Sequence, residues 1–272
     1  VTITAADINK LRQTTGAGML DCRKALTESN GDFEAAIDWL RKQGQKVAAK
    51  RSDREAKEGV VIAQTTADNK SGIVLCISCE TDFVSKNADF VAFAQSIADA
   101  AIANNVKTAE ELNGVAVNGS TVAELINDKL AAIGEKIAVS KFERVEAPYV
   151  ASYIHGANRM GVLVSMTKEA ADAGKDVAMQ IAAMNPLAVD ETSISPETIA
   201  REKEIAIEQI KAEGKPAEMA EKIALGKVNK FFKENTLMAQ AFVKDNSKSV
   251  ADYLKSIDAE LKVTDFKRVA LG

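Results

Sequence analysis

The strongest constraint on the fold is an internal repeat that covers most of the chain's 272 residues. Two apolar runs separated by a short polar turn, which is the pattern of a β-hairpin, occur twice, and a segment with helical periodicity follows each pair. Such self-similarity indicates that one supersecondary unit is present in two copies. The predicted strands are 59–66, 72–78, 149–155 and 161–167, and the predicted helices after them are 89–103 and 175–184.

Each copy continues with a second pair of matching segments. The sequence Thr-Val-Ala-Glu-Leu-Ile at 121–126, followed by Phe-Glu-Arg-Val at 142–145, is echoed by Ser-Val-Ala-Asp-Tyr-Leu at 249–254 and Phe-Lys-Arg-Val at 266–269. A unit therefore consists of a hairpin, two helices and a third strand. Because three antiparallel strands backed by helices make an α+β layer, two such units side by side form the predicted core.

Residues 186–235 interrupt the second copy of the unit. Ser195-Pro196 predicts a helix start with proline at the first helical position, and Gly214-Lys215-Pro216 predicts a sharp turn to a second helix. The insertion is therefore predicted to be a hairpin of two antiparallel helices, which either projects from the core or folds back on it. A projecting hairpin is compatible with a monomer bound to one partner and with a homodimer built through the hairpins. The first core subdomain is predicted at 59–148. The second consists of 149–185 and 236–272, on either side of the insertion.

The first 43 residues predict three short helices that form a small domain. Glycine-containing segments break the helical pattern twice, and Thr4 and Asp32 precede the first and third helices as N-caps. A bundle of about forty residues is marginally stable by itself and usually exists to present a surface. Residues 44–58 are predicted as a solvated, partly helical linker to the core.

Several apolar side chains lie where they can serve either the core or a binding surface. Arg12, Met19 and Leu20 flank the break between the first two helices, and Met19 and Leu20 are equally compatible with burial and with exposure. Asp82 and Phe83 connect a predicted strand to a predicted helix. Either Asp82 caps a helical turn with Phe83 buried beneath it, which is the commoner arrangement, or Phe83 points outward at a partner.

Composition restricts the class of partner. The net charge of −4 and the pI of about 5.4 argue against a general attraction to nucleic acid or to a membrane surface. No run of about 18 apolar residues predicts a membrane-spanning helix, and no basic segment leads into an apolar one near Val1 as in a secretory signal. Three cysteines in a chain of this length are typical of a reducing compartment, so a cytoplasmic protein is expected.

The inventory of reactive side chains argues against an enzyme. His155 is the only histidine, so a His-rich metal site is excluded and a catalytic triad would depend on that one residue. Neither phosphate-binding glycine motif is present, and no cofactor is expected. A redox or metal site at Cys76-x-x-Cys79 is an alternative. A spacing of three along a predicted strand, however, directs the two thiols to opposite faces.

Three motifs resemble bacterial translation elongation factor Ts: Thr14–Leu26, Glu80–Val84 and His155–Val162. The resemblance covers almost the whole chain. It implies a ubiquitin-associated-like domain at 1–43, two repeated α+β core subdomains and a projecting coiled-coil hairpin at 186–235.

The resemblance also implies a function in protein biosynthesis. Members of the family are guanine nucleotide exchange factors for elongation factor Tu, whose GDP-bound and nucleotide-free forms they bind. The Thr-Asp-Phe-Val motif, which dislodges magnesium from the GTPase, corresponds to Thr81, Asp82, Phe83 and Val84. A non-catalytic adaptor that binds other partners through its N-terminal domain, and a paralogue that serves another GTPase, are the alternatives.

Further contacts with the GTPase follow from the same resemblance. Leu20 replaces a methionine found in many relatives, which is a mild change. A C-terminal helix that some members place against the GTPase is not expected, since the sequence ends at Gly272. The residues that match contact positions of the family are Arg12, Met19, Leu20, Ile133, Gly134, Glu135 and His155.

Overall fold

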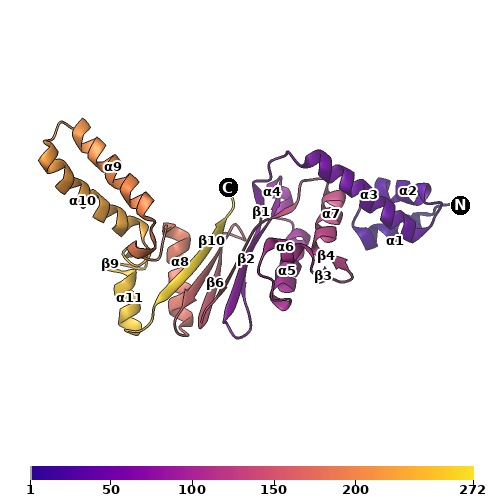
Figure 1. Ribbon diagram of the computed structural model, residues 1–272. Helices are drawn as coiled ribbons and strands as arrows, with labels where there is room; N and C mark the ends of the chain where they lie inside the picture. Colours follow the sequence, from indigo (N-terminus) through magenta and orange to yellow (C-terminus); the bar gives the residue numbers. More distant parts are fainter. Residues whose placement is uncertain (1) are drawn as a thin grey trace.

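Two three-stranded antiparallel sheets form the centre of the molecule, and helices extend from them in both directions (Figure 1). The computed structural model describes residues 2–272. The predicted α+β class with two small antiparallel sheets is confirmed. In order across each sheet, the strands are β1 (Glu58–Thr65), β2 (Ser71–Cys79) and β5 (Ala138–Glu146), then β10 (Val263–Ala270), β7 (Met160–Met166) and β6 (Tyr149–His155).

The central strand of each sheet is buried on both faces. Alternate side chains of β2 pack against helix α5 (Ala88–Ala103), and the side chains between them pack against the other sheet. In β7, one set of alternate side chains packs on helix α8 (Ala171–Met184), while Leu163 faces β2. Burial of both faces explains why these strands read as continuous apolar runs rather than as alternating ones.

Two glycines in equivalent positions of the repeat bring the sheets close together. A Cβ placed on Gly161 of β7 would lie 2.9 Å from Cγ1 of Val61 and 2.9 Å from Cγ2 of Val74. A Cβ on Gly72 of β2 would lie 3.0 Å from Cδ2 of Leu163. Because β-carbons essentially never come within 3.0 Å of other carbons, a side chain at position 161 would force the sheets to shift, and one at position 72 would crowd Leu163.

Hydrogen bonds across the two sheets set which strand ends lie together. The turn between β6 and β7 lies on β1, where the N–H of Val61 donates to the carbonyl of Asn158 (2.8 Å) and the Asn158 amide donates to the Val61 carbonyl (3.1 Å). Arg159 also pairs with Glu58 at 3.0 Å, and Glu58 lies opposite Cys79 in the sheet. The second hairpin's turn and the end of β2 therefore share one end of the core.

The three predicted N-terminal helices are present as α1 (Ala5–Thr15), α2 (Met19–Glu28) and α3 (Phe33–Arg51). Thr4 and Asp7 form a capping box at α1, and the Asp32 side chain accepts a hydrogen bond from the N–H of Ala35 at α3. A small apolar core holds the bundle together. Its fully or nearly fully buried members are Leu11, Ala17, Cys22, Ala25, Leu26, Ala36 and Leu40.

The third helix does not end at residue 43, where the sequence placed a boundary. It continues to Arg51, so the first part of the predicted linker 44–58 belongs to α3. Gly44 is buried against helix α7 (Val122–Ile133), and a Cβ there would lie 2.8 Å from Cβ of Ala131. The segment was interpreted as solvated because its side chains are polar. The close helix contact depends instead on the missing side chain of Gly44.

The insertion projects away from the sheets as two antiparallel helices, α9 (Pro196–Ala212) and α10 (Ala217–Asn235), at the far end of the molecule from α1–α3 (Figure 1). It therefore does not fold back on the core. At its base, the N–H of Leu187 donates to the carbonyl of Asn235 (2.8 Å). The helices pack through the small buried side chains of Ala206, Ala220 and Ala224 together with Ile210.

Short elements that the sequence did not predict complete each unit. A two-stranded ribbon precedes the second helix of each unit, and a capping box starts that helix, with Thr121 at α7 and Ser249 at α11. Within residues 2–272, no helix is both long and apolar enough to cross a membrane. The remaining elements are α4 (Asp82–Ser85), α6 (Ala109–Asn113), β3 (Ala116–Val117), β4 (Ser120–Thr121), a 3₁₀ turn (Glu191–Ser193), β8 (Ala241–Phe242), β9 (Asp245–Ser249) and α11 (Val250–Ile257).

The packing of the sheets predicts that Gly161→Ala destabilises the core. The added methyl group must displace Val61 and Val74, which are held by the sheets, so we expect a loss of about 1–3 kcal/mol in the free energy of unfolding. Urea denaturation followed by circular dichroism measures it. Gly226→Ala is the control, because Gly226 lies on α10 with open space around it and alanine favours a helix. Equal midpoints for the two variants would contradict the close packing.

Candidate functional site

Phe83 lies on the short helix α4 directly after β2, and its side chain is 86% exposed. The interpretation that Phe83 fills the core beneath a cap is therefore wrong. Asp82 is not the cap either, because Thr81 occupies that position and the Asp82 carboxylate pairs with Lys86 at 2.7 Å. The Lys86 ammonium holds the pKa of Asp82 below its usual range, so the acid is ionised at neutral pH. A large exposed aromatic beside a charge is typical of a binding site.

The backbone that carries Asp82 and Phe83 is anchored on both sides. Val84 packs against the apolar core of the first sheet, and Ser85 is buried. On the other side, Glu135 reaches across from the loop after α7. Its Oε2 accepts hydrogen bonds from the N–H groups of Glu80 (3.0 Å) and Thr81 (3.1 Å), and its Oε1 accepts one from the Thr81 hydroxyl (2.6 Å). Asp82 and Phe83 therefore lie on a turn whose backbone is held in place.

Glu80 joins this turn to the end of α3. Its carboxylate accepts hydrogen bonds from the N–H of Lys136 (2.6 Å), from Arg51 (2.8 Å) and from Arg54 (3.1 Å). The Lys136 N–H, aided by the two guanidinium groups, holds the pKa of Glu80 below its usual range. The Lys136 ammonium in turn donates to the carbonyls of Ser52 (2.5 Å) and Arg54 (3.0 Å). Three segments that are far apart in the sequence thus meet at one point.

The predicted contact loop at Ile133-Gly134-Glu135 therefore lies beside the Thr81–Val84 motif. Gly134 ends α7 in the left-handed conformation, with φ +80°, which a glycine adopts without strain. Ile133 remains 37% exposed. The sequence indicates that both segments belong to the site only through the family resemblance. It did not predict the carboxylate of Glu135 as the link between them.

The α1–α3 bundle carries further exposed residues that the family pattern predicts. Met19 and Leu20 are 54% and 81% exposed, which decides the choice between core and surface in favour of surface. The loop between α1 and α2 touches α7, since a Cβ on Gly16 would lie 3.9 Å from Cβ of Ala132. A groove of about 970 Å³ lies between the bundle and the first sheet's helices, and Phe83 and Ile133 line it. Arg12 is also exposed, on α1.

His155 belongs to a separate part of the surface. It is exposed at the end of β6, next to the turn that lies on β1, and its Nδ1 is 3.0 Å from the Tyr153 hydroxyl. The bonds from Asn158 and Arg159 to β1 place this turn at the same end of the core as α4. The residues predicted from the family pattern thus lie in three places: on the α1–α3 bundle, at the turn after β2 with the loop after α7, and at the second hairpin's turn.

Comparison with known proteins decides the family. The family model described as "Elongation factor TS" matches residues 80–272. Proteins named elongation factor Ts are similar over the full length: that of Flavobacterium psychrophilum is 52% identical, covering 100% of this chain and 99% of the relative, and that of Clostridium perfringens strain ATCC 13124 is 44% identical, covering 99% and 93%. The chain belongs to the elongation factor Ts family.

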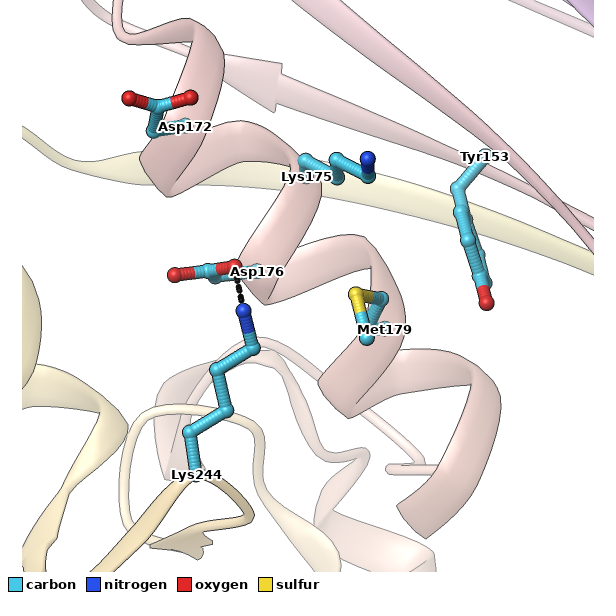
Figure 2. Close-up of a pocket in the computed structure, with 6 residues that line it drawn as sticks. All are labelled: Tyr153, Asp172, Lys175, Asp176, Met179 and Lys244. Carbon is cyan, nitrogen blue, oxygen red and sulfur yellow. Dashed lines mark hydrogen bonds and ion pairs between the residues drawn. The ribbon is translucent and has the colours of Figure 1, made fainter.

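A second hollow occurs on the C-terminal half of this elongation factor Ts family member. It measures about 610 Å³ and lies between β6, α8 and the turn from β8 to β9 (Figure 2). Lys244 reaches across to Asp176, with Nζ 2.5 Å from Oδ1, and the Tyr253 hydroxyl donates to the other Asp176 oxygen at 2.7 Å. Tyr153 lines the hollow and bonds to His155. The two bonds to Asp176 join segments distant in the sequence, so no local motif signals them.

The cysteines of this elongation factor Ts family member do not form a reactive pair. Cys79 is buried in the apolar core beneath the helices, and Cys76 is buried between the two sheets, so the thiols lie on opposite faces of β2 as predicted. Burial raises the pKa of both, for Cys79 to about 12. Among residues 2–216 and 219–272, no group of three or more potential ligands could hold a metal ion. A redox site at this pair has no support from the geometry.

The raised pKa predicts slow chemistry at Cys79. At about pH 8 only about one Cys79 side chain in ten thousand is a thiolate, the form that reacts with iodoacetamide, and apolar packing excludes the reagent as well. We expect alkylation at least a hundredfold slower in native protein than in concentrated guanidinium, where all three cysteines react freely, measured by peptide mass spectrometry. Rapid labelling of native Cys79 would contradict the buried position.

Proposed function

We propose that this protein releases GDP from elongation factor Tu, with Asp82 and Phe83 as a wedge that disturbs the Mg²⁺ site of the GTPase. The observation that carries the proposal is the 86% exposure of Phe83 on a turn that Glu135 and the core hold in place. Membership of the elongation factor Ts family supports the choice of partner. The exchange needs no chemical step, so the protein is not an enzyme in the usual sense.

A wedge is suited to this task because of how Mg²⁺ is held. The ion requires near-ideal octahedral geometry from oxygen ligands, so a small displacement of its surroundings weakens it sharply, and GDP with it. Phe83 supplies a bulky, stiff group with two side-chain torsions, which loses little entropy on insertion. Asp82 supplies a negative charge that can accept hydrogen bonds from donors exposed by the opening and repel the phosphates.

The remaining exposed residues supply binding energy away from the nucleotide. Met19 and Leu20, with Arg12, form one candidate contact on the α1–α3 bundle. Ile133 and Gly134 lie beside the wedge, and His155 lies on the second hairpin. Binding energy from these sites offsets the cost of distorting the GTPase. No direct contact with nucleic acid is part of the proposal, which places the protein in the cytoplasm with the translation machinery.

Thermodynamic linkage sets a condition on the proposal. If the exchange factor weakens GDP binding by some factor, GDP must weaken binding of the exchange factor by the same factor. A partner that bound the GDP-bound and nucleotide-free forms equally well would exchange nothing. The wedge must therefore fit the distorted, nucleotide-free form better than the GDP-bound form.

The wedge predicts that Phe83→Ala slows GDP release by about tenfold to a hundredfold, since about 2 kcal/mol or more is typical of a central aromatic contact. Asp82→Ala should also slow release. Stopped-flow fluorescence of labelled GDP on elongation factor Tu measures the rate at saturating factor. Ile257→Ala is the control, because Ile257 is also exposed but lies on α11.

Binding without faster release by the unaltered protein would reject exchange and favour an adaptor. Fast release that neither Phe83→Ala nor Asp82→Ala slows would keep the exchange function but move its mechanism away from the Asp-Phe pair.

The bundle contact predicts a different effect for Leu20→Ala. The side chain is 81% exposed and is far from the nucleotide in the proposed complex, so its loss should weaken binding without changing the maximal release rate. We expect the factor concentration for half-maximal release to rise about threefold to tenfold. A titration of the release rate against factor concentration separates the two quantities. A lower maximal rate with unchanged half-maximal concentration would contradict a pure binding role.

A further inference from the structure

The carboxylate of Glu135 accepts hydrogen bonds from other residues of the same chain. Both of its oxygens accept hydrogen bonds, two from backbone N–H groups and one from the Thr81 hydroxyl, all between 2.6 and 3.1 Å. Charge-assisted bonds of this kind are roughly twice as strong as neutral ones. The Thr81 side chain makes no capping bond to α4, and the Glu135 carboxylate instead accepts the N–H of the N-cap residue Thr81, as the glutamate at the third helical position does in a capping box.

Glu80 and the Glu135–Lys136 segment donate hydrogen bonds to each other in both directions. Its own N–H donates to Glu135, while its carboxylate accepts the N–H of Lys136, the residue after Glu135. The end of β2 and the loop after α7 are therefore held to each other through three backbone N–H groups and two carboxylates. Arg51 and Arg54 add the end of α3 to the same carboxylate of Glu80.

The turn that carries the wedge has little else to orient it. Helix α4 spans four residues, which is too short to be stable by its own hydrogen bonds. Phe83 is almost entirely exposed, so its side chain cannot set the direction of the backbone. On the far side, Val84 and Ser85 anchor the turn, and the Cys79 thiol donates to the Thr81 carbonyl at 3.3 Å. The direction in which Asp82 and Phe83 point therefore depends on the backbone at Glu80 and Thr81.

We propose that Glu135 is a positioning residue for nucleotide exchange, which orients Asp82 and Phe83 through its hydrogen bonds to Glu80 and Thr81. This inference rests on the proposed exchange function. It differs from a partner contact by Glu135, because the residue acts through the turn and not on the GTPase. A turn that is free to reorient inserts the wedge less often, so the maximal release rate falls while binding through Met19, Leu20 and His155 persists.

Glutamine provides the discriminating substitution. In Glu135→Gln the amide oxygen accepts both backbone N–H bonds, and the amide NH₂ donates to the Thr81 hydroxyl, so the turn keeps its partners while the charge is lost. Glu135→Ala removes all three bonds. Glu143→Ala is the matched control, because Glu143 is an exposed glutamate on the nearby strand β5 and has no side-chain bond within the described residues.

The first measurement is GDP release from elongation factor Tu, titrated with each variant. We expect Glu135→Ala to lower the maximal release rate about tenfold with a half-maximal concentration within about twofold of the unaltered protein. Glu135→Gln should restore the rate to within about threefold, and Glu143→Ala should change nothing. A Glu135→Gln rate as low as that of Glu135→Ala would overturn the proposal, because it would show that the charge and not the hydrogen bonds matters.

The second measurement needs no GTPase and so separates this inference from the exchange function. Amide hydrogen exchange of Glu80 and Thr81, followed by NMR in the full chain, should quicken at least tenfold in Glu135→Ala and stay protected in Glu135→Gln. Unchanged protection in Glu135→Ala would overturn the positioning role whatever the release rates. Failure of the unaltered protein to release GDP would instead overturn the exchange function alone. Equal melting temperatures confirm that the variants are folded.

Discussion

The contact between the two sheets determines where the candidate functional segments of the core lie relative to one another. Gly72 and Gly161 have no side chains that would hold β2 and β7 apart. The two central strands therefore pack face to face, and both faces of each strand are buried. Each sheet is too small to bury its apolar surface alone, since three short strands with one or two helices make a minimal layer. The two units of the repeat therefore stabilise each other by packing. The helices on their outer faces can then connect to other parts of the chain.

This pairing brings distant loops to one end of the core. The turn after β6 lies on β1 through Asn158 and Arg159, and β1 in turn pairs with the end of β2, which leads into α4. An exchange factor must contact its partner over a wide surface and still act at one point. In the proposed mechanism, the wedge and the second hairpin lie on the same rigid block, so binding at the hairpin would strain the partner at the wedge.

Rigidity around the Asp82–Phe83 turn comes from carboxylates on one side and from the packing of Val84 and Ser85 on the other. An exposed Phe83 cannot be held by apolar contacts of its own, so the fixed geometry is provided by the hydrogen bonds of Glu80 and Glu135 beneath it. The same Glu80 contacts Arg51 at the end of α3, which also packs on α7 through Gly44. The N-terminal bundle is therefore attached to the core next to the wedge and does not hang from a free linker.

Sequence patterns determined the repeat, the sheets, the helices of the bundle and the inserted hairpin, because each depends on local periodicity and on caps such as Thr4 and Asp32 that act within a few residues. The motif around Phe83 marked the site, but only tertiary structure decided that Phe83, Met19 and Leu20 are exposed, since burial depends on which segments fold against them. The continuation of α3 past residue 43 and the bonds between Glu80 and Glu135, 55 residues apart, were likewise beyond sequence patterns. Such contacts leave no local periodicity, because they are set by the close approach of distant backbones.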